Sequence, residues 1–395
     1  MPLKEPETMS HSTDTVLIAA LCGRSLVRAA HAAMIPVTVL DVFCDSDTLR
    51  WADAAGLVGN VSSGINFQRL LEMADRLCPA KKCAGLVYGA GFESDPGALA
   101  DLSKGRMLFG NEPEVLAAIN TPEHFFATLE RLGVPFPALR FQAPVVPDGW
   151  LAKHAGASGG AHVQPARRVS GQGGYYFQRK LSGRVLSLLF LANGRAAQIV
   201  GVSEQWQTGA GATPYAYAGA ISQQRVSDAL FGDFRGLVRT LTREWKLRGL
   251  NSVDLVVSGD EFSVLEVNAR PVATAELYDN QKHGSLFRQH LAACCGAVLP
   301  SACRSERMYA QRLVYAGHDL YVADLFGWPA WCSDKPAAGT LVHRGEPVCS
   351  VHASGDSLYA VNDILQRRSS FMQQVFEPAC NFPGEPGLQN AGASS

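Results

Sequence analysis

The sequence has no excess of charge of either sign, because its 395 residues carry 35 Lys and Arg against 36 Asp and Glu. Proteins that bind nucleic acids or acidic membranes usually show a basic excess or stripe, so we expect neither partner here. Long hydrophobic runs are also missing. The longest strongly apolar segments, residues 16–22 and 185–192, are far shorter than the roughly 20 residues that cross a bilayer.

The opening segment MPLKEPETMS is polar and lacks the apolar core of a secretory signal. The ten cysteines include no CxxC spacing and no tight Cys/His cluster, which predicts neither a zinc site nor a redox dithiol. We therefore expect a soluble cytoplasmic protein whose cysteines are reduced thiols packed as small hydrophobic side chains.

The first part of the chain alternates buried strands and helices. Residues 16–21 and 37–42 read as strands that flank a helix, which is a βαβ unit. Its turn holds the single Gly23 in place of the GxGxxG of a dinucleotide site. A helix at residues 66–77 and a strand at 84–88 follow, and the loop GAGF comes next. Loops at strand ends often face ligands in open sheets, although an ordinary βα turn is the alternative. We predict a doubly wound α/β domain over residues 14–108, after a disordered tail at residues 1–13.

A second segment begins with a helix that is predicted from Pro122 to Leu132. Thr121 is its expected N-cap, Pro122 occupies the first helical position, and Gly133 is its stop. From Trp150 onward the pattern changes to short strands and glycine loops.

Two further helices are predicted near residues 227–247 and 284–294. After them, short apolar runs alternate with Gly, Pro and Asp turns, which predicts a small β-rich domain over residues 304–379. Its strand-length runs are residues 313–315, 319–322, 340–343 and 348–352. Residues 380–395 are predicted to be a disordered tail.

The strongest chemical pattern is SVDLVVSGDEFSVLEVNARP at residues 252–271. Two apolar strands flank a turn at residues 258–261, which is typical of a β-hairpin. If the turn is centred on Asp260, Asp254 lies directly opposite Glu266. Side chains paired in this way have Cβ atoms about 4.5–5.5 Å apart.

Two carboxylates placed so closely on apolar strands repel each other unless a cation lies between them. Period-two alternation puts Asn268 and Arg270 on the face of Glu266, so the strand offers a carboxylate, an amide oxygen and a guanidinium in line. Such hard oxygen ligands suit Mg²⁺. The alternative is a hairpin whose acidic side chains face solvent.

A second pattern is a strand that ends in Lys153, followed by the loop HAGASGGAH. Free backbone N–H groups in such a loop can close over phosphates while the lysine supplies a point charge. A mobile linker, with His154 and His162 as plain loop residues, is the alternative. A third pattern, at residues 175–192, reads as two strands joined by a short connector.

Taken in order, these patterns resemble the ATP-grasp superfamily over roughly residues 14–300. The matching pieces are GVPFP after a helix, the strand lysine, the SGG loop, QRKLSG, YAGAI at residues 217–221, and LEVNARP. The resemblance implies a mixed α/β and α+β fold. The N-terminal α/β domain would precede an ATP-grasp domain at residues 109–303, in which two α+β lobes clasp ATP, and the β-rich domain would follow.

The resemblance also implies roles for individual residues. Lys153 and its loop would cover the ATP phosphates, with Arg270 meeting the acyl carboxylate or the transferred phosphate; Lys153 and Arg270 are thus the expected catalytic residues. The remaining expected ATP contacts are Gly156, Ser158, Gly159, Gly160, Gln178, Arg179, Lys180 and Leu181. The expected Mg²⁺ ligands are Asp254, Glu266 and Asn268.

Three positions depart from the usual pattern of the superfamily. Pro122 stands where many members carry a second lysine for phosphate, Gln178 where an acid is common, and Val185 where some members place an acid that binds ribose. At Pro122 and Val185 the resemblance therefore implies no contact to phosphate or ribose.

The activity implied is an ATP-dependent ligase that forms an amide through an acylphosphate, from small carboxylate and amine substrates that the sequence does not name. A narrower resemblance, to ATP-grasp proteins encoded with one-carbon carrier biosynthesis in methylotrophs, suggests that glutamate is added to a methanofuran- or methanopterin-type precursor. The terminal segment is similar to that of biotin carboxylase-like members, so a bicarbonate-dependent carboxylase stays open. A non-catalytic MgATP-binding regulator and a homodimer stay open too.

Overall fold

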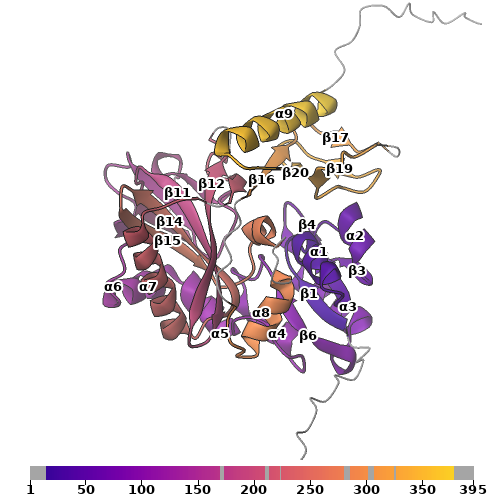
Figure 1. The fold of residues 1–395 in the computed structure, drawn as a ribbon, viewed down its shortest axis with the longest axis horizontal. Helices are drawn as coiled ribbons and strands as arrows, with labels where there is room; N and C mark the ends of the chain where they lie inside the picture. Colours follow the sequence, from indigo (N-terminus) through magenta and orange to yellow (C-terminus); the bar gives the residue numbers. More distant parts are fainter. Residues whose placement is uncertain are drawn as a thin grey trace, which may run out of the picture.

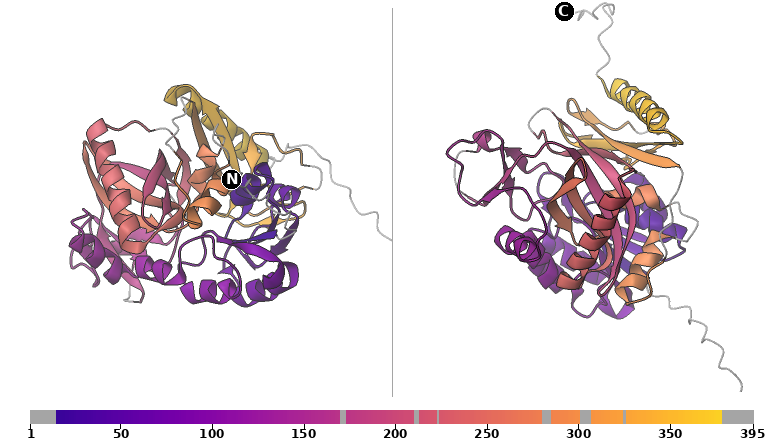
Figure 2. Two further views of the ribbon diagram at one scale, coloured as in Figure 1. Left: turned by 60° about the horizontal axis from the view of Figure 1, so that its bottom comes forward. Right: turned by 60° about the vertical axis from the view of Figure 1, so that its left-hand side comes forward.

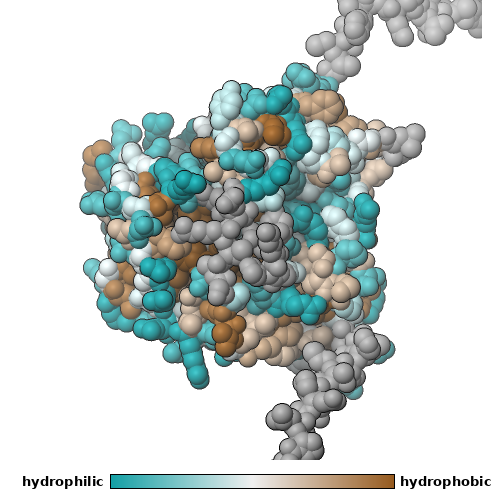
Figure 3. Space-filling model, in the orientation of Figure 1, coloured by the Kyte–Doolittle hydropathy of each residue, from teal (hydrophilic) through white to brown (hydrophobic). Residues whose placement is uncertain are grey.

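The computed structural model describes residues 15–169, 173–209, 213–222, 224–279, 285–300, 307–323 and 326–377. The two tails predicted to be disordered, residues 1–13 and 380–395, lie outside these ranges. Within them, none of the helices combines the length and the apolar character that crossing a membrane would require. Hydrophilic and hydrophobic residues are interspersed over the face shown in Figure 3.

The N-terminal part is a four-stranded parallel sheet in the order β3-β2-β1-β6, which confirms the predicted βαβ unit (Figure 1). Its strands are near-continuous apolar runs because helices cover both faces, as parallel sheets require. The strands are β1 (Thr15–Ala19), β2 (Val37–Asp41), β3 (Ala54–Leu57) and β6 (Cys83–Tyr88). The helices are α1 (Arg24–Ala32), α2 (Ser46–Trp51), α3 (Phe67–Leu77), η1 (Ala80–Lys82) and α4 (Pro96–Ser103), with a small hairpin of β4 (Gly59–Asn60) and β5 (Gly64–Ile65).

Helices α5 (Pro113–Asn120) and α6 (Pro122–Arg131) lead into a small antiparallel sheet in the order β7-β10-β8-β9. Pro122 begins α6 as predicted. However, the Thr121 side chain does not cap it, because its hydroxyl donates instead to the Ala117 carbonyl oxygen at 2.8 Å. The strands are β7 (Leu139–Arg140), β8 (Trp150–His154), β9 (Val163–Pro165) and β10 (Tyr175–Arg179), with the short helix η2 (Ala166–Arg168).

The largest sheet has eight strands in the order β15-β14-β11-β12-β13-β16-β20-β18. Helix α7 (Asp228–Trp245) packs its apolar stripe against it, with Phe234 and Leu241 fully buried. The strands are β11 (Arg184–Asn193), β12 (Ala197–Gln207), β13 (Tyr217–Ile221), β14 (Arg248–Ser258), β15 (Glu261–Asn268), β16 (Met308–Tyr315), β18 (Cys332–Ser333) and β20 (Pro347–Gly355). Helices η3 (Ala273–Tyr278) and α8 (Leu286–Cys294) follow β15.

The C-terminal part differs from the separate β-rich domain that the sequence predicts. Its strands β16, β20 and β18 extend the large sheet, because β13 pairs with β16. Only β17 (Leu320–Tyr321) and β19 (Leu341–Val342) form a sheet of their own within the described residues of this part. The chain then forms an unpredicted helix, α9 (Leu358–Phe376), which lies over this end of the sheet (Figure 2). Its apolar stripe is sparse in sequence, with Val361, Leu365 and Met372 as its buried hydrophobic residues.

Candidate functional site

Asp254 and Glu266 are directly opposed across the β14–β15 hairpin, as predicted. The reason differs from the predicted one. The tight turn is centred between Gly259 and Asp260, since Ser258 pairs with Glu261. This register alone would place Asp254 opposite Leu265. A β-bulge next to Asp254 inserts one residue on β15 and thereby brings the two carboxylates together.

The two carboxylates differ in their preferred charge. Asp254 is only 8% exposed. Its burial, followed by repulsion from Glu266, raises its pKa to about 8. Burial, the largest single influence, also opposes ionisation of Glu266, but the Lys153 ammonium together with the hydrogen bond from Asp254 and the charges of His162 and Arg270 outweighs it, so the pKa of Glu266 is lowered. The alternative with both acids facing solvent is therefore wrong, and the pair holds one proton near neutrality where a cation could take its place.

The amides beside the pair donate to Asp254. Gln205 Nε2 lies 3.3 Å from Asp254 Oδ1, and Asn268 Nδ2 lies 3.5 Å from Asp254 Oδ2. Asn268 thus stands beside the carboxylates on the same strand face, as the alternation predicted. Gln205 comes from β12, which is separated from β14 by β11 in the sheet and which the sequence patterns did not connect to the site.

Lys153 lies in β8, in register with Tyr176 of β10. Its side chain is 6% exposed, and burial lowers its pKa against the attraction of Glu266 and Asp254. A buried lysine so close to two carboxylates is consistent with a cation that neutralises negative charge in this site. The structure therefore brings Lys153 and the hairpin carboxylates together from two different sheets.

The glycine loop after β8 depends on left-handed backbone. Gly156, Gly159 and Gly160 have φ values of 72°, 73° and 73°, which other residues rarely adopt. At Gly160 there is no room for a side chain, because a Cβ would lie 2.1 Å from the Tyr215 carbonyl oxygen. The loop, which includes Ser158, is tied to the large sheet by the Tyr217 N–H, which donates to the Gly159 carbonyl at 3.0 Å.

The four residues expected near adenine lie at the end of β10, which includes Gln178 and Arg179, and at the start of the connector to β11, which includes Lys180 and Leu181. Gln178 is 1% exposed, and its Nε2 has no hydrogen-bond partner among the described residues. An amide donor buried in this way costs free energy until an acceptor reaches it. Arg179 instead donates to the Asp148 carbonyl at 3.2 Å. Lys180 lies 5.6 Å from the ring of Tyr215, and Leu181 is 38% exposed.

Arg270 has a partner that sequence reasoning missed. Its Nε donates to Glu93 Oε1 at 2.5 Å, and Nη2 donates to Asn268 Oδ1 at 3.0 Å. Glu93 also accepts from the Gly91 N–H at 2.7 Å. It directly follows the GAGF loop, which enters at the carboxyl end of β6. Strands β2 and β6 flank β1 on opposite sides, and ligands usually bind at such a switch point. The sequence pattern indicated the GAGF loop as a segment that could face a ligand, but it did not indicate Glu93, the acidic residue that follows the loop.

A small cavity lies beside the carboxylate pair and joins α6, the glycine loop, β10 and β15. Residues that line it include Pro122, His154, Gly156, His162, Tyr176 and Glu266. Pro122, which replaces the expected second lysine, therefore faces the site without a charge. His154 and His162 line the cavity rather than forming a plain linker. Burial lowers the pKa of His162, and its Nδ1 has no partner among the described residues.

Residues 123–274 match the family described as the ATP-grasp domain. No curated protein matches the chain. Solved structures, in contrast, are similar to the chain. N5-carboxyaminoimidazole ribonucleotide synthetase from Thermus thermophilus is 17% identical with a TM-score of 0.66, and the alignment covers 94% of this chain and 100% of that chain.

Two biotin carboxylases have similar TM-scores at lower sequence identity. The enzyme from Campylobacter jejuni, solved as a β-γ-ATP complex, is 12% identical with a TM-score of 0.66. The alignment covers 88% of this chain and 89% of that chain. The biotin carboxylase domain of Hydrogenobacter thermophilus 2-oxoglutarate carboxylase, with MgADP, ADP and bicarbonate, is 10% identical with a TM-score of 0.67, covering 89% and 88%. At such identities the likeness shows the fold. Residues 123–274 thus match the ATP-grasp domain, and the chain has the mixed α/β ATP-grasp fold.

Proposed function

We propose that the chain is an ATP-dependent ligase that joins a carboxylate to an amine. The observation that carries this proposal is the opposed pair Asp254 and Glu266, which faces the buried Lys153 beside a cavity. Two carboxylates held this close favour a divalent cation, and a lysine beside them favours a phosphate on that cation. ATP and Mg²⁺ are the ligands that the similar structures suggest.

In this proposal Asp254, Glu266 and Asn268 hold Mg²⁺, which neutralises the charge of the ATP phosphates when it is bound. Asn268 can present its Oδ1 to the ion once Arg270 releases it. Lys153 adds a point charge, and the N–H groups of the loop at Gly156, Ser158, Gly159 and Gly160 donate to phosphate oxygens.

The adenine would lie against the end of β10 and the residues that follow it, Gln178, Arg179, Lys180 and Leu181. Gln178 fits this place because its buried Nε2 still needs an acceptor, and a ring nitrogen of adenine supplies one. The Arg179 side chain donates to the Asp148 carbonyl oxygen and its backbone N–H donates to the Ala138 carbonyl oxygen at 2.8 Å, so both of these donors are engaged away from the nucleotide.

The reaction joins two steps. A carboxylate oxygen of the first substrate forms a bond to the γ-phosphorus of ATP while the bond to the β-phosphate oxygen breaks, which gives an acylphosphate and ADP. The amine nitrogen then attacks the acyl carbon, phosphate leaves, and the amine loses a proton. Arg270 would orient the carboxylate or the transferred phosphate, with Glu93 fixing the plane of its guanidinium. Such chemistry needs positioning and charge neutralisation more than a protein nucleophile.

Bicarbonate is a second candidate for the activated carboxylate. The similar biotin carboxylase domain was crystallised with this anion, which supports a carboxylase. Bicarbonate-stimulated release of ADP without any other carboxylate would identify it. The uncharged Pro122 in the cavity supports a third candidate, a regulator that binds MgATP without turnover. Our narrowest proposal is that glutamate is joined to a methanofuran- or methanopterin-type precursor, and it depends on the sequence resemblance alone.

The test removes both hairpin carboxylates. We expect Asp254→Asn with Glu266→Gln to abolish the ADP release that requires both a carboxylate and an amine. The matched control, Asp260→Asn with Glu261→Gln, makes the same changes at the turn of the same hairpin and should keep the activity. If the first double variant turns over like the second, the assignment of the metal site is wrong.

A further inference from the structure

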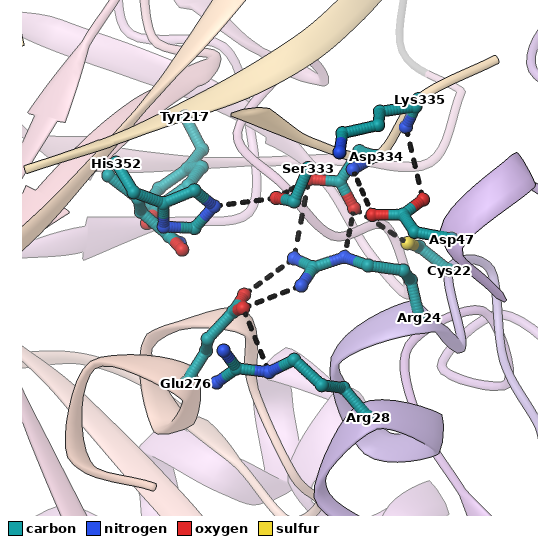
Figure 4. Close-up of polar contacts among 11 residues, drawn as sticks. Cys22, Arg24, Arg28, Asp47, Tyr217, Glu276, Ser333, Asp334, Lys335 and His352 are labelled. Carbon is teal, nitrogen blue, oxygen red and sulfur yellow. Dashed lines mark hydrogen bonds and ion pairs between the residues drawn. The ribbon is translucent and has the colours of Figure 1, made fainter. Parts of the chain in front are cut away.

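A second cluster of ionisable side chains lies apart from the hairpin carboxylates, where the N-terminal sheet meets the C-terminal strands. Cys22 and Arg24 follow β1, Asp45 precedes α2, Glu276 lies in η3, and Asp334 follows β18. Figure 4 shows side chains of this region pointing toward one another from segments that are far apart in the sequence. No part of the proposed ligase chemistry uses them.

Most members of the cluster have partners. Arg24 donates through Nη1 and Nη2 to the two carboxylate oxygens of Glu276, at 2.5 Å each, and through Nε to Asp334 Oδ1 at 2.7 Å (Figure 4). The Asp47 carboxylate accepts from the backbone N–H groups of Asp334 and Lys335, at 3.0 and 3.2 Å. These contacts hold Asp334 against Arg24 and Asp47, which follow strands β1 and β2 of the N-terminal sheet.

Asp45 is the exception. It is 2% exposed, and its Oδ2 has no hydrogen-bond partner among the described residues. It stands at the N-cap position of α2, yet its side chain caps nothing there. Burial of an ionised carboxylate without a partner destabilises the folded state by roughly several kcal/mol, unless a cation or a proton neutralises the charge. The contacts among the described residues therefore leave Asp45 Oδ2 unsatisfied.

The thiol of Cys22 and carboxylate oxygens of Asp45 and Asp334 lie within 4.8 Å of one another. Ligands at the usual zinc distances, about 2.3 Å for sulfur and about 2.1 Å for oxygen, lie roughly 3.4–3.6 Å apart around a tetrahedral ion. A small closure would therefore let one ion contact all three. A thiolate beside carboxylates selects a transition ion such as Zn²⁺, whereas Mg²⁺ prefers oxygen ligands alone.

We propose that Cys22, Asp45 and Asp334 bind one divalent transition-metal ion of the zinc class. Cys22 is exposed, which gives the ion a path in and leaves a coordination position for water or another ligand. Cys22 releases its thiol proton to solvent as the ion binds. Arg24 orients the Asp334 carboxylate through its Nε, which donates to Asp334 Oδ1 at 2.7 Å, as residues around metal ligands commonly do. The ion ties the ends of β1 and β2 to the segment after β18.

Cobalt binding to the full, chelator-treated chain tests this site. Thiolate ligation of Co²⁺ gives a near-ultraviolet charge-transfer band, which a site of oxygen ligands does not produce. We expect one equivalent of Co²⁺ to produce the band and Zn²⁺ to displace it. Cys22→Ser should abolish the band, and Asp45→Asn should weaken Co²⁺ binding by roughly 10-fold or more.

Two controls separate this site from others. Cys295→Ser changes an exposed cysteine on the far end of α8 and should leave the band intact. Asp254→Asn removes a ligand of the proposed Mg²⁺ site and should leave it intact too, so that the two sites can fail independently. The absence of the band in the unsubstituted chain, or its persistence in Cys22→Ser, would overturn the proposal.

Discussion

Replacement of Asp254 by Asn should stabilise the ligand-free protein while it removes a proposed metal ligand. The pKa of Asp254 is raised from 3.8 to about 8 by burial and by Glu266. The folded state therefore binds a proton that the unfolded state releases between these values, so that stability falls as the pH rises through this window. At 1.36 kcal/mol per pH unit, the loss is about 4 kcal/mol at pH 7 and about 2 kcal/mol at pH 5.

Asparagine keeps the shape of the protonated acid but cannot ionise, so the variant should lack this loss. Urea unfolding at the two pH values measures it. We expect the free energy of unfolding of Asp254→Asn to exceed that of the unsubstituted chain by up to about 4 kcal/mol at pH 7, and by less at pH 5. Asp260→Asn, at the exposed turn of the same hairpin, is the control and should change neither value.

MgATP should reverse this order, because a ligand that binds only the folded state stabilises it by an amount that grows with the logarithm of the ratio of ligand concentration to Kd. The unsubstituted chain should gain stability from MgATP, and Asp254→Asn should gain little. The reasoning is refuted if the variant is no more stable than the unsubstituted chain at pH 7, or if its advantage is equally large at pH 5.

Two further predictions concern the glycine loop and an acid-sensitive histidine. Gly160→Ala should raise the KM for ATP, because its Cβ would lie 2.1 Å from the Tyr215 carbonyl oxygen. Gly159→Ala is the matched control, because Gly159 has the same φ of 73° but no atom within 4 Å of an added Cβ, so that this variant should lose only about 1–2 kcal/mol of stability to backbone strain. Equal KM values for ATP in the two variants, measured by steady-state kinetics, would contradict the placement of ATP phosphates at Gly160. His290 is fully buried, and its Nδ1 accepts from the Leu250 N–H at 2.8 Å. Burial lowers its pKa from 6.5 to about 4. The unfolded state therefore binds more protons in this range, and stability should fall by up to about 3 kcal/mol as the pH falls from 6.5 to 4; a pH series in urea that shows the same slope in His290→Gln would disprove the assignment.

Local patterns in the sequence predicted much of the fold. The apolar runs of β1 and β2, the proline at the start of α6 and the amphipathic α7 each depend on neighbours a few residues away, so that periodicity and capping suffice. Helix α9 was missed because its stripe is sparse and gains its burial from β16 and β20. The join between β13 and β16 was missed because strand pairing between distant segments leaves no local signal.

The hairpin shows where a correct prediction rested on an incomplete reason. Opposition of Asp254 and Glu266 was predicted from a turn centred on Asp260, whereas the structure combines a tighter turn with a bulge at Leu265. Side-chain alternation fixes which face a residue occupies, but packing decides where a bulge is tolerated. The pairing could be predicted, and its bulge could not.

The sequence by itself determined the order of elements and the residue types of the candidate ATP site, because both are set by short-range spacing along one hairpin and one loop. Only the tertiary structure placed Glu93 on Arg270, which is 177 residues away, and Arg24 on Glu276, which is 252 residues away. The same holds for Cys22, Asp45 and Asp334, whose spacing resembles no metal motif. Such contacts arise where the ends of different sheets meet, and that meeting is decided by the packing of whole elements rather than by any local pattern.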